Sequence, residues 1–266
     1  MTDLDASAPL FDVRVPHIAR IYDYWLGGKD NFQADREAAE LAIAANPTIV
    51  PGVRANRRFL GRAVRYLAGQ GITQFLDVGT GIPAANNTHE VAQSVVEDSR
   101  VVYVDNDPIV LSHARALLTG TPGTVSYIDA DARDTRRILE EAARTLDFSQ
   151  PVGVMLIAVL HCIPDEDDPA GLVATLMDAV PAGSYLALSH PAIDQVPEAG
   201  ARGQESLSRS LGKKVTYRTH DQVARFFAGL ELVDEGVVPV HVWHPESELD
   251  TKSRPTGMWG AVAKKP

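Results

Sequence analysis

Short apolar runs, separated by stretches with helical spacing, alternate along the chain from residue 71 to its end. Runs of this length, bounded by turn residues, are typical of strands buried on both faces of a parallel sheet. The expected strands span residues 74–78, 101–104, 124–128, 152–160, 184–189, 236–243 and 258–264, and the helices between them include 108–118, 135–144, 171–180 and 222–227. With the last two strands as a closing hairpin, the pattern predicts an α/β fold with a doubly wound, seven-stranded, Rossmann-like sheet.

Three helices are predicted before the first strand. They span residues 16–25, 34–45 and 53–68. Gly27 and Gly28 end the first helix, because glycine tolerates the left-handed conformation of a helix cap. We therefore divide the chain into an N-terminal helical extension or lid (1–70) and a Rossmann-like domain (71–266), with the ligand at the carboxyl ends of the first strands.

The composition narrows the classes of protein to which the chain can belong. With 266 residues, 45% of them apolar, the chain can bury one sizeable core. Its net charge of -10 disfavours nucleic acid as a partner. Asp3 and Asp5 stand where a signal peptide would carry positive charge, and the longest apolar run, residues 152–160, has about half the length of a bilayer span. The single cysteine, Cys162, excludes an internal disulfide. From these three features together we expect a cytoplasmic protein that binds no membrane.

Residues 75–81 read Phe-Leu-Asp-Val-Gly-Thr-Gly, an apolar run that ends in a glycine loop. The polar and glycine positions of this loop are Asp77, Gly79, Thr80 and Gly81. A dinucleotide fingerprint would place a third glycine near position 84, but Ala84 stands there and Pro83 interrupts the loop. Asp77 would also repel a pyrophosphate, whereas it favours the cationic amino group of a methionine-derived cofactor. The loop therefore argues against NAD, although Asp77 could instead only cap its own loop.

Acidic residues follow the next two expected strands. Asp105, 26 positions after the first glycine of the loop, suits a carboxylate that accepts hydrogen bonds from two ribose hydroxyls. Asp107 precedes Pro108 and is assigned instead to capping the following helix. After the third strand, we expect Asp131 to accept a hydrogen bond from an adenine amino group and Asp129 to face solvent.

Four segments carry a resemblance to a known family. They are ARIYDYWLGGKDNF (19–32), ANRRFL (55–60), VYVDNDP (102–108) and Val159-Leu160-His161 with Pro164-Asp165. Together they resemble the actinobacterial family of S-adenosylmethionine-dependent methyltransferase-like proteins, over nearly the whole chain. The first segment is specific to that family, while the glycine loop and the strand-end acid are shared with class I methyltransferases in general. The resemblance implies a seven-stranded class I methyltransferase sheet with an antiparallel last strand, S-adenosylmethionine as cofactor, and a poorly defined acceptor.

The resemblance also implies which residues hold the cofactor. It places Asp77, Gly79, Thr80 and Gly81 around the methionine part, Asp105 and Asn106 at the ribose and base, Asp131 and Ala132 at the adenine, and Leu160 and His161 in the wall near the sulfonium. Cys162, where relatives are expected to carry a larger apolar residue, is a mild departure that leaves the cofactor assignment intact.

The N-terminal motif would fold over this pocket. Gly28 would allow a close backbone approach to the ligand, and Tyr22, Lys29 and Asn31 would supply polar groups beside it. Arg57 or Lys29 would meet the carboxylate of the cofactor. Two alternatives stay open: the glycines only cap a helix, and Arg57 belongs to a solvated face of its helix.

Methyl transfer needs little covalent help, because the sulfonium is already activated and the protein mainly aligns the acceptor. A base is optional, and His161 and His190, at expected strand ends, are the candidate catalytic residues; the alternative for both is a structural role. The polar segment 191–210 could form part of the acceptor wall. The acidic run 165–168 is interpreted as a helix start, so no metal site is predicted.

Three functions compete at this point. The favoured one is an S-adenosylmethionine-dependent methyltransferase acting on an unidentified small-molecule acceptor. The others are a non-catalytic regulatory protein that binds S-adenosylmethionine and, with less support, an NAD-dependent oxidoreductase. No oligomeric state is predicted.

Overall fold

The protein is described by a computed structural model that covers residues 12–110, 112, 123–247 and 255–266. Five parallel strands form the centre of its sheet: β1 (Gln74–Val78), β2 (Arg100–Asp105), β3 (Val125–Asp129), β4 (Gly153–Ile157) and β5 (Tyr185–Pro191). The sheet continues through β8 (Met258–Lys264), which is antiparallel to β5. Within the described residues the strand order is β3-β2-β1-β4-β5-β8-β6. The predicted doubly wound sheet with an antiparallel last strand is confirmed.

Two predicted strands are shorter than expected. Ala158 has a φ of 52°, and this left-handed residue turns the chain out of the sheet, so the strand predicted at 152–160 ends at Ile157. In the strand predicted at 236–243, only Val238–Pro239 form a strand, β7, which pairs with β8; the amide of Val240 still bonds the carbonyl of Met258 (3.1 Å), and a turn closed by the amide of Val242 on the carbonyl of Pro239 (2.9 Å) then ends the pairing. A second short strand, β6 (Glu231–Leu232), pairs further along β8 and was not predicted.

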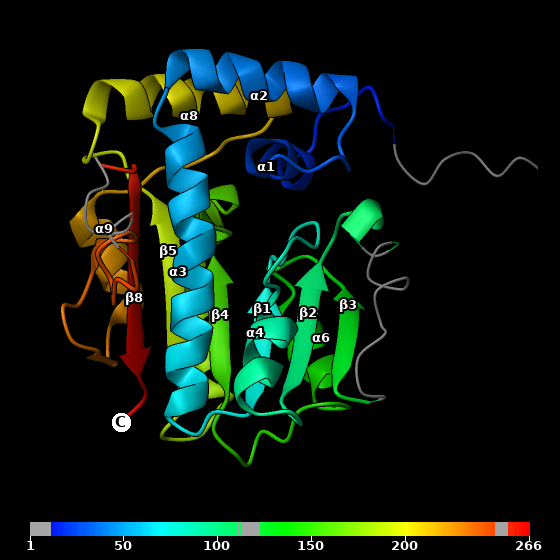
Figure 1. Cartoon of the computed structure of the whole chain (residues 1–266), viewed down its shortest axis with the longest axis vertical. Coiled ribbons are helices and arrows are strands. Elements are labelled where there is room, and N and C mark those ends of the chain that lie inside the picture. The colour runs from blue at the N-terminus through cyan, green and yellow to red at the C-terminus, as the bar shows by residue number, and fades with distance from the viewer. Residues whose placement is uncertain (1–11, 111, 113–122, 248–254) are drawn as a thin grey trace, which may run out of the picture.

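Helices cover both faces of the sheet (Figure 1). They are α3 (Ile49–Gly69), α4 (Thr88–Val95), α6 (Thr135–Ala142), α7 (Pro169–Asp178) and α9 (His220–Ala224), with the short 3-10 turns η1 (Leu160–Cys162), η2 (Asp165–Asp167) and η3 (Arg225–Phe227). α3 and α4 enclose one hydrophobic core against the sheet, and α6, α7 and η3 enclose the other. Of the helix predicted at 108–118, residues 108–110 and 112 are helical, and the rest lies outside the described residues.

A third layer lies across the carboxyl ends of the strands, where α1 (Ile18–Leu26), α2 (Gln33–Ala45) and α8 (Pro197–Leu211) meet (Figure 1). α2 and α8 run side by side. Together with α1 and the start of α3 they enclose a core that contains Ile21, Trp25 and Leu207. This layer roofs the edge of the sheet where ligands bind in doubly wound folds. The division of the chain at residue 70 stays a prediction.

The segment 191–210 was expected to be a polar loop, but most of it forms α8. Pro197 at the first helical position and Gly212 after the end, with a φ of 62°, are the usual boundaries of a helix. The helix is polar because most of it faces solvent. At Gly203 a Cβ would lie 2.9 Å from the Cβ of Asn46, so glycine lets α8 approach the end of α2 closely.

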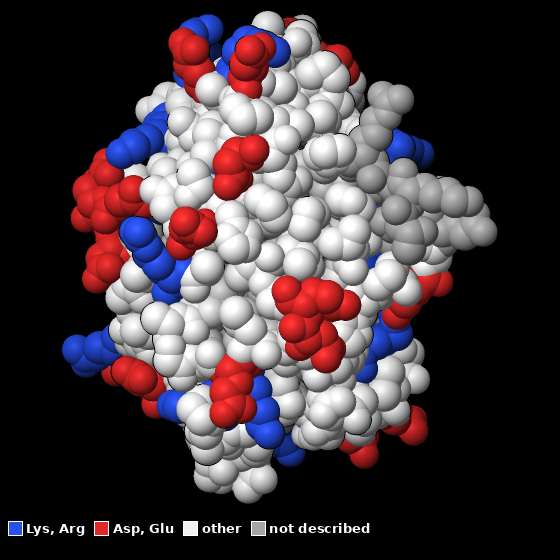
Figure 2. Space-filling model, turned by 90° about the vertical axis from the view of Figure 1, so that its left-hand side faces the viewer, with Lys and Arg blue, Asp and Glu red and all other residues white. Residues whose placement is uncertain are grey.

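None of the described helices is long and apolar enough to cross a bilayer. On the face shown in Figure 2, Lys and Arg side chains alternate with Asp and Glu and do not gather into one basic area.

Candidate cofactor and acceptor site

A cavity of about 330 Å³ lies at the carboxyl ends of β1–β4, beneath α1 and the start of α3. Eleven residues predicted from the sequence line it: Tyr22, Arg57, Asp77, Gly79, Thr80, Gly81, Asp105, Asn106, Asp131, Ala132 and His161. They come from six separate segments of the chain, so the fold brings together most of the predicted site. Five predicted residues, Gly28, Lys29, Asn31, Leu160 and His190, lie outside the lining.

The glycine loop after β1 is held against β2 and β4. The amide of Gly79 donates a hydrogen bond to the carbonyl of Val104 (2.8 Å). Gly79 has a φ of 77°, and a Cβ there would lie 2.3 Å from Val159 Cγ2, so both its conformation and its surroundings require glycine. The loop thus turns sharply at the end of β1 and leaves the backbone exposed to the cavity.

Asp77 is buried at the floor of the cavity, 3% exposed. Its Oδ2 accepts a hydrogen bond from Thr88 Oγ1 (2.6 Å). Burial raises the pKa of this carboxyl to about 6, because the charged form loses its hydration. A cation that entered the cavity beside Asp77 would therefore stabilise the ionised carboxylate.

Asp105 closes the neighbouring strand and supports the glycine loop directly. One carboxylate oxygen accepts from the amide of Gly81 (2.8 Å) and the other from the amide of Asp107 (2.9 Å). Burial raises the pKa of Asp105. Asp107 accepts from the amide of Ile109 (2.9 Å), which is the helix-capping role that the sequence indicated. Its other oxygen lies 2.7 Å from His17 Nδ1, so β2 is tied to the start of α1.

Asp131, after β3, is paired with an arginine that the sequence analysis did not assign. Both oxygens of Asp131 accept hydrogen bonds from the guanidinium of Arg133 (2.9 and 2.7 Å), whose third nitrogen reaches Asp167 (2.9 Å). The hydrogen bonds from Arg133 lower the pKa of Asp131. Asp131 therefore stays ionised at the rim of the cavity, beside Ala132 and Asn106. Asp129 is exposed, as predicted.

The roof of the cavity is formed by α1 and α3. Asn56 Nδ2 donates to the hydroxyl of Tyr22 (3.0 Å), while Asn56 Oδ1 is buried without a hydrogen-bond partner among the described residues. Arg57 donates to the carbonyls of Ala84 and Ala85 (3.2 and 3.0 Å) and so ties α3 to the loop after β1. Arg57 also lines the cavity, so it does not lie only on a solvated face of its helix, which was the alternative.

The loop 27–32 does not reach the cavity, and Asp23 explains why. Gly27, with a φ of 86°, caps α1, and a Cβ on Gly28 would lie 1.9 Å from Asp23 Oδ1. Asp23 Oδ2 accepts hydrogen bonds from Asn31 Nδ2 (2.8 Å) and from the amide of Asp30 (2.9 Å). Gly28 and Asn31 therefore pack against Asp23 instead of a ligand. Lys29 is exposed. The alternative of a helix cap followed by an ordinary loop fits these contacts.

His161 lies in η1, directly after β4. Its side chain is 6% exposed, and its Nδ1 has no hydrogen-bond partner among the described residues, while Nε2 lies 3.5 Å from Cys162 Sγ. Burial, together with the charges of Arg218 and Lys213, lowers the pKa of His161 to about 4. The imidazole is therefore uncharged near neutral pH. Burial also raises the pKa of Cys162 to about 11, so its thiol stays protonated.

Arg218 holds the turn that carries His161. This buried guanidinium donates to the carbonyls of Leu160 and Ile163 (both 2.9 Å), on either side of the turn, and to Asp165 Oδ1 (2.7 Å). Its Nη1 also lies 2.7 Å from His190 Nε2. A buried cation with these partners fixes the turn in one position.

His190 and Leu160 support the site without lining it. His190 is fully buried, and its Nδ1 lies 2.9 Å from the carbonyl of Pro191, so neighbouring groups occupy both of its ring nitrogens. The predicted catalytic role of His190 does not fit this position, since no ring nitrogen faces the cavity. Leu160 is also fully buried, and only its carbonyl takes part, as an acceptor for Arg218.

A second, smaller cavity of about 40 Å³ adjoins the first. The two share Ile18, Tyr22, Ala158 and His161. The other lining residues are Trp25, Asn46, Thr48, Ile49, Gly52, Val53, Pro191, Leu207, Tyr217, Thr256, Gly257 and Met258. The wall is largely apolar, and His161 stands at the junction of the two cavities.

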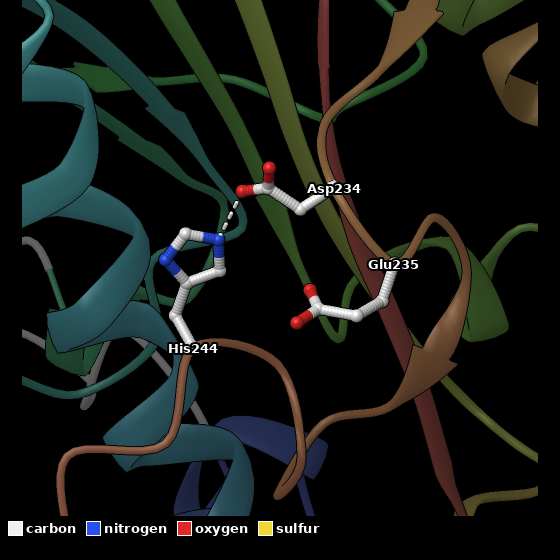
Figure 3. Close-up of side chains that lie close together, drawn as sticks. All are labelled: Asp234, Glu235 and His244. Carbon is white, nitrogen blue, oxygen red and sulfur yellow. Dashed lines mark hydrogen bonds and ion pairs between the residues drawn. The ribbon is translucent and has the colours of Figure 1, made fainter.

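Asp234, Glu235 and His244 form a separate cluster beside α3, away from the cavities (Figure 3). Their potential ligand atoms lie within 4.8 Å of one another, and His244 Nε2 hydrogen-bonds Asp234. The ring of His244 also packs edge-to-face on Tyr66, with centroids 5.1 Å apart. Because the acids are exposed and the histidine is paired with one of them, the contacts account for the cluster without a ligand.

Sequence reasoning missed several residues around the cavities. Asn56 lies inside the ANRRFL segment next to Arg57, so the motif itself could have indicated it. Arg133 follows Asp131 by two positions, a spacing at which side chains in a loop can pair. Arg218 is distant in sequence from the turn that it holds and leaves no local signal.

Comparison with known proteins places the chain in a family. A family model described as S-adenosyl methyltransferase matches residues 5–266. A DUF574 family protein from Streptomyces avermitilis is 45% identical, with 96% of this chain and 99% of that chain covered and a TM-score of 0.92. A proposed methyltransferase from Thermobifida fusca is 39% identical, with 98% and 99% covered and a TM-score of 0.90. None of the curated proteins matches the chain.

More distant structures share the fold. The plantazolicin methyltransferase BpumL, in complex with a monoazolic desmethylPZN analog and SAH, is 10% identical, covers 93% of this chain and 95% of its own, and has a TM-score of 0.52. At this identity the likeness shows the fold alone.

The chain belongs to the S-adenosyl methyltransferase family, and S-adenosylmethionine is its cofactor. The residues of the larger cavity fit this molecule: Asp77 suits its ammonium group, Asp105 its ribose, and the glycine loop a close backbone approach. The alternative of an NAD-dependent oxidoreductase is therefore not retained.

Proposed function

We propose that the protein transfers a methyl group from S-adenosylmethionine to a small-molecule acceptor, with His161 as the base. The observation that carries the proposal is the Nδ1 of His161. It is a buried ring nitrogen without a hydrogen-bond partner among the described residues, on a side chain that lines both a cavity suited to the cofactor and a smaller apolar one. With the ring proton on Nε2, Nδ1 is an acceptor. We also expect this activity in the cytoplasm.

The cofactor half of the site is assigned as follows. Asp77 would pair with the ammonium group, Arg57 with the carboxylate, and Asp105 with the ribose hydroxyls. Gly79, Thr80 and Gly81 would offer backbone to the methionine part, and Asn106, Asp131 and Ala132 would flank the base. When bound, the cofactor supplies a methyl group already activated by its sulfonium.

On the side of the site that we assign to the methyl acceptor, His161 is the group proposed to take a proton. The bound cofactor would supply its methyl group to the acceptor oxygen and leave as the thioether, and the hydroxyl proton would pass to His161 Nδ1. A hydroxyl that is being methylated becomes strongly acidic, so even a base whose pKa is about 4 can receive its proton. Arg218 acts through this turn as a positioning residue.

The test is methyl transfer from labelled S-adenosylmethionine into the small-molecule fraction of a cell extract, with wild type and His161→Ala side by side. Both proteins should bind S-adenosylhomocysteine, and only the wild type should form a labelled product of low mass. Equal labelling by both proteins would remove His161 as the base. Cofactor binding with no labelling by wild type would favour the regulatory alternative.

A further inference from the structure

The smaller cavity has no role in holding the cofactor as assigned above. Apart from the four residues shared with the larger cavity, its wall comes from α1, the end of α2 and the start of α3, β5, α8 and the segment after it, and the start of β8 with the two residues before it. These elements form the roof and the far edge of the sheet, so the cavity continues the larger one away from Asp77 and Asp105.

We propose that the smaller cavity is the acceptor subsite and that it takes the uncharged, apolar end of a small compound whose hydroxyl group lies at His161. The proposal rests on the function proposed above and names its substrate class.

The wall of the smaller cavity is uncharged. No Asp, Glu, Lys or Arg is among the residues that line the smaller cavity, although 23% of the chain is charged. Moving an ionic group from water into such a wall is costly unless an opposite charge awaits it. The part of the acceptor that enters the cavity is therefore neutral.

The wall of the smaller cavity offers few free hydrogen-bonding groups. Most polar side chains of the wall already have partners: the Tyr22 hydroxyl contacts Asn56, Asn46 Oδ1 accepts from Thr48, and Thr256 contacts His241. Two side-chain groups of this wall have no hydrogen-bond partner among the described residues, the buried Nδ1 of His161 and the hydroxyl of Tyr217. In the tautomer that carries the ring proton on Nε2, a ligand that donates one hydrogen bond at this junction satisfies His161 Nδ1, as a hydroxyl does.

A hydroxyl suits this cavity better than an amine does. An alkylamine is protonated near neutral pH, with a pKa of about 10. It meets no opposite charge among the residues that line the smaller cavity, so a protonated amine is disfavoured there. A hydroxyl, by contrast, attacks while it still carries its proton.

The volume limits the size of the group. A cavity of about 40 Å³ has room for roughly three water-sized groups. The acceptor's buried end is therefore about as large as a short branched alkyl group.

Four small probes with the same branched skeleton test the proposal: 2-propanol, acetone, the isopropylammonium ion and acetate. Saturation-transfer NMR would measure the contact of each with protein already loaded with S-adenosylhomocysteine, and calorimetry would first establish that loading. We expect 2-propanol to be contacted most strongly, with acetone about fivefold weaker because it lacks a donor. The two ions should show no contact.

Two matched variants locate the contact. Val53→Phe fills the smaller cavity and should abolish the 2-propanol signal, whereas Val95→Phe, at an exposed position on α4, should leave it unchanged. If Val53→Phe no longer binds S-adenosylhomocysteine, Leu207→Trp replaces it, since Leu207 lines the same cavity from α8.

No contact with 2-propanol in loaded protein overturns the proposal. Contact with either ion overturns it too, and so does contact with acetone as strong as the contact with 2-propanol. A 2-propanol signal that survives filling of the cavity also overturns it. Failure of the wild type to bind S-adenosylhomocysteine would instead contradict the proposed function, so the two failures can be told apart.

Discussion

The two halves of the site are built in different ways. In the cofactor half, Asp77 and Asp105 lie in the last residues of two adjacent parallel strands and the glycine loop follows the first of them, while backbone amides hold the carboxylate of Asp105. In the acceptor half, a turn carrying His161 is held by Arg218, which comes from a segment far along the chain. The cofactor half depends on strand topology, whereas the acceptor half depends on one buried side chain.

The largest effect is expected from Arg218→Met. The change removes the guanidinium donor from the buried carbonyls of Leu160 and Ile163, of which Leu160 keeps the amide of Ile163 as a donor (3.2 Å), so the free energy of unfolding should fall by about 3 kcal/mol. The pKa of His161 should rise from about 4, since a cation beside it is lost. Chemical denaturation and NMR titration of the histidines measure the two effects.

Arg209→Met is the matched control for this prediction. Arg209 is exposed on α8 and pairs only with Glu205, so neither the unfolding free energy nor the titration of His161 should change. An Arg218 variant as stable as this control would show that the turn does not depend on the guanidinium.

Asp77 makes stability depend on pH. Its pKa is about 6 in the folded protein against 3.8 for the free group, so the folded state binds the proton more tightly than the unfolded chain. Protonated Asp77 makes its full contribution to stability below about pH 4, and this contribution is lost as the pH rises through 6. The free energy of unfolding changes by about 3 kcal/mol over this range. Relative to wild type, Asp77→Asn should gain stability over this range.

Denaturation curves of wild type and Asp77→Asn from pH 4 to 7 measure this difference. Saturating S-adenosylhomocysteine should shrink it in the wild type, because an ammonium group favours the charged carboxylate. Parallel stability curves for the two proteins would show that burial does not raise the pKa of Asp77.

Asp105 should matter for the cofactor more than for the fold. Asp105→Ala should weaken binding of S-adenosylhomocysteine by about 2 to 3 kcal/mol, or roughly 30- to 150-fold, the scale of losing charged hydrogen bonds. Asp129→Ala is the control, since Asp129 pairs in register with Asp105 on β3 but is exposed and outside the cavity lining. Equal affinity of the two variants would remove Asp105 from the site.

The smallest effect concerns the loop after α1. Gly28→Ala places a methyl group against Asp23 and should cost about 1 to 2 kcal/mol of stability, while cofactor affinity stays within about twofold. Gly69→Ala, at the open end of α3, should be neutral or stabilising. A large loss of cofactor affinity in Gly28→Ala would restore the loop to the binding site.

The same contrast explains what the sequence could predict. Strand ends in a parallel sheet meet at one edge, so Asp77, Asp105 and Asp131 could be placed together from periodicity alone. The polar loop 27–32 was misassigned because its glycine serves a local contact with Asp23, which a motif cannot distinguish from contact with a ligand. Arg218 and His190 form their pair through tertiary packing, and no spacing in the chain encodes it.

The separation of the two halves is tested most directly by titrating S-adenosylhomocysteine into Asp105→Ala and His161→Ala under the same conditions. The structure predicts roughly 30- to 150-fold weaker binding for Asp105→Ala and a change within about twofold for His161→Ala. Comparable losses in both variants, or a loss confined to His161→Ala, would contradict the assignment of the cofactor to the β1–β3 side and of the acceptor to the turn after β4.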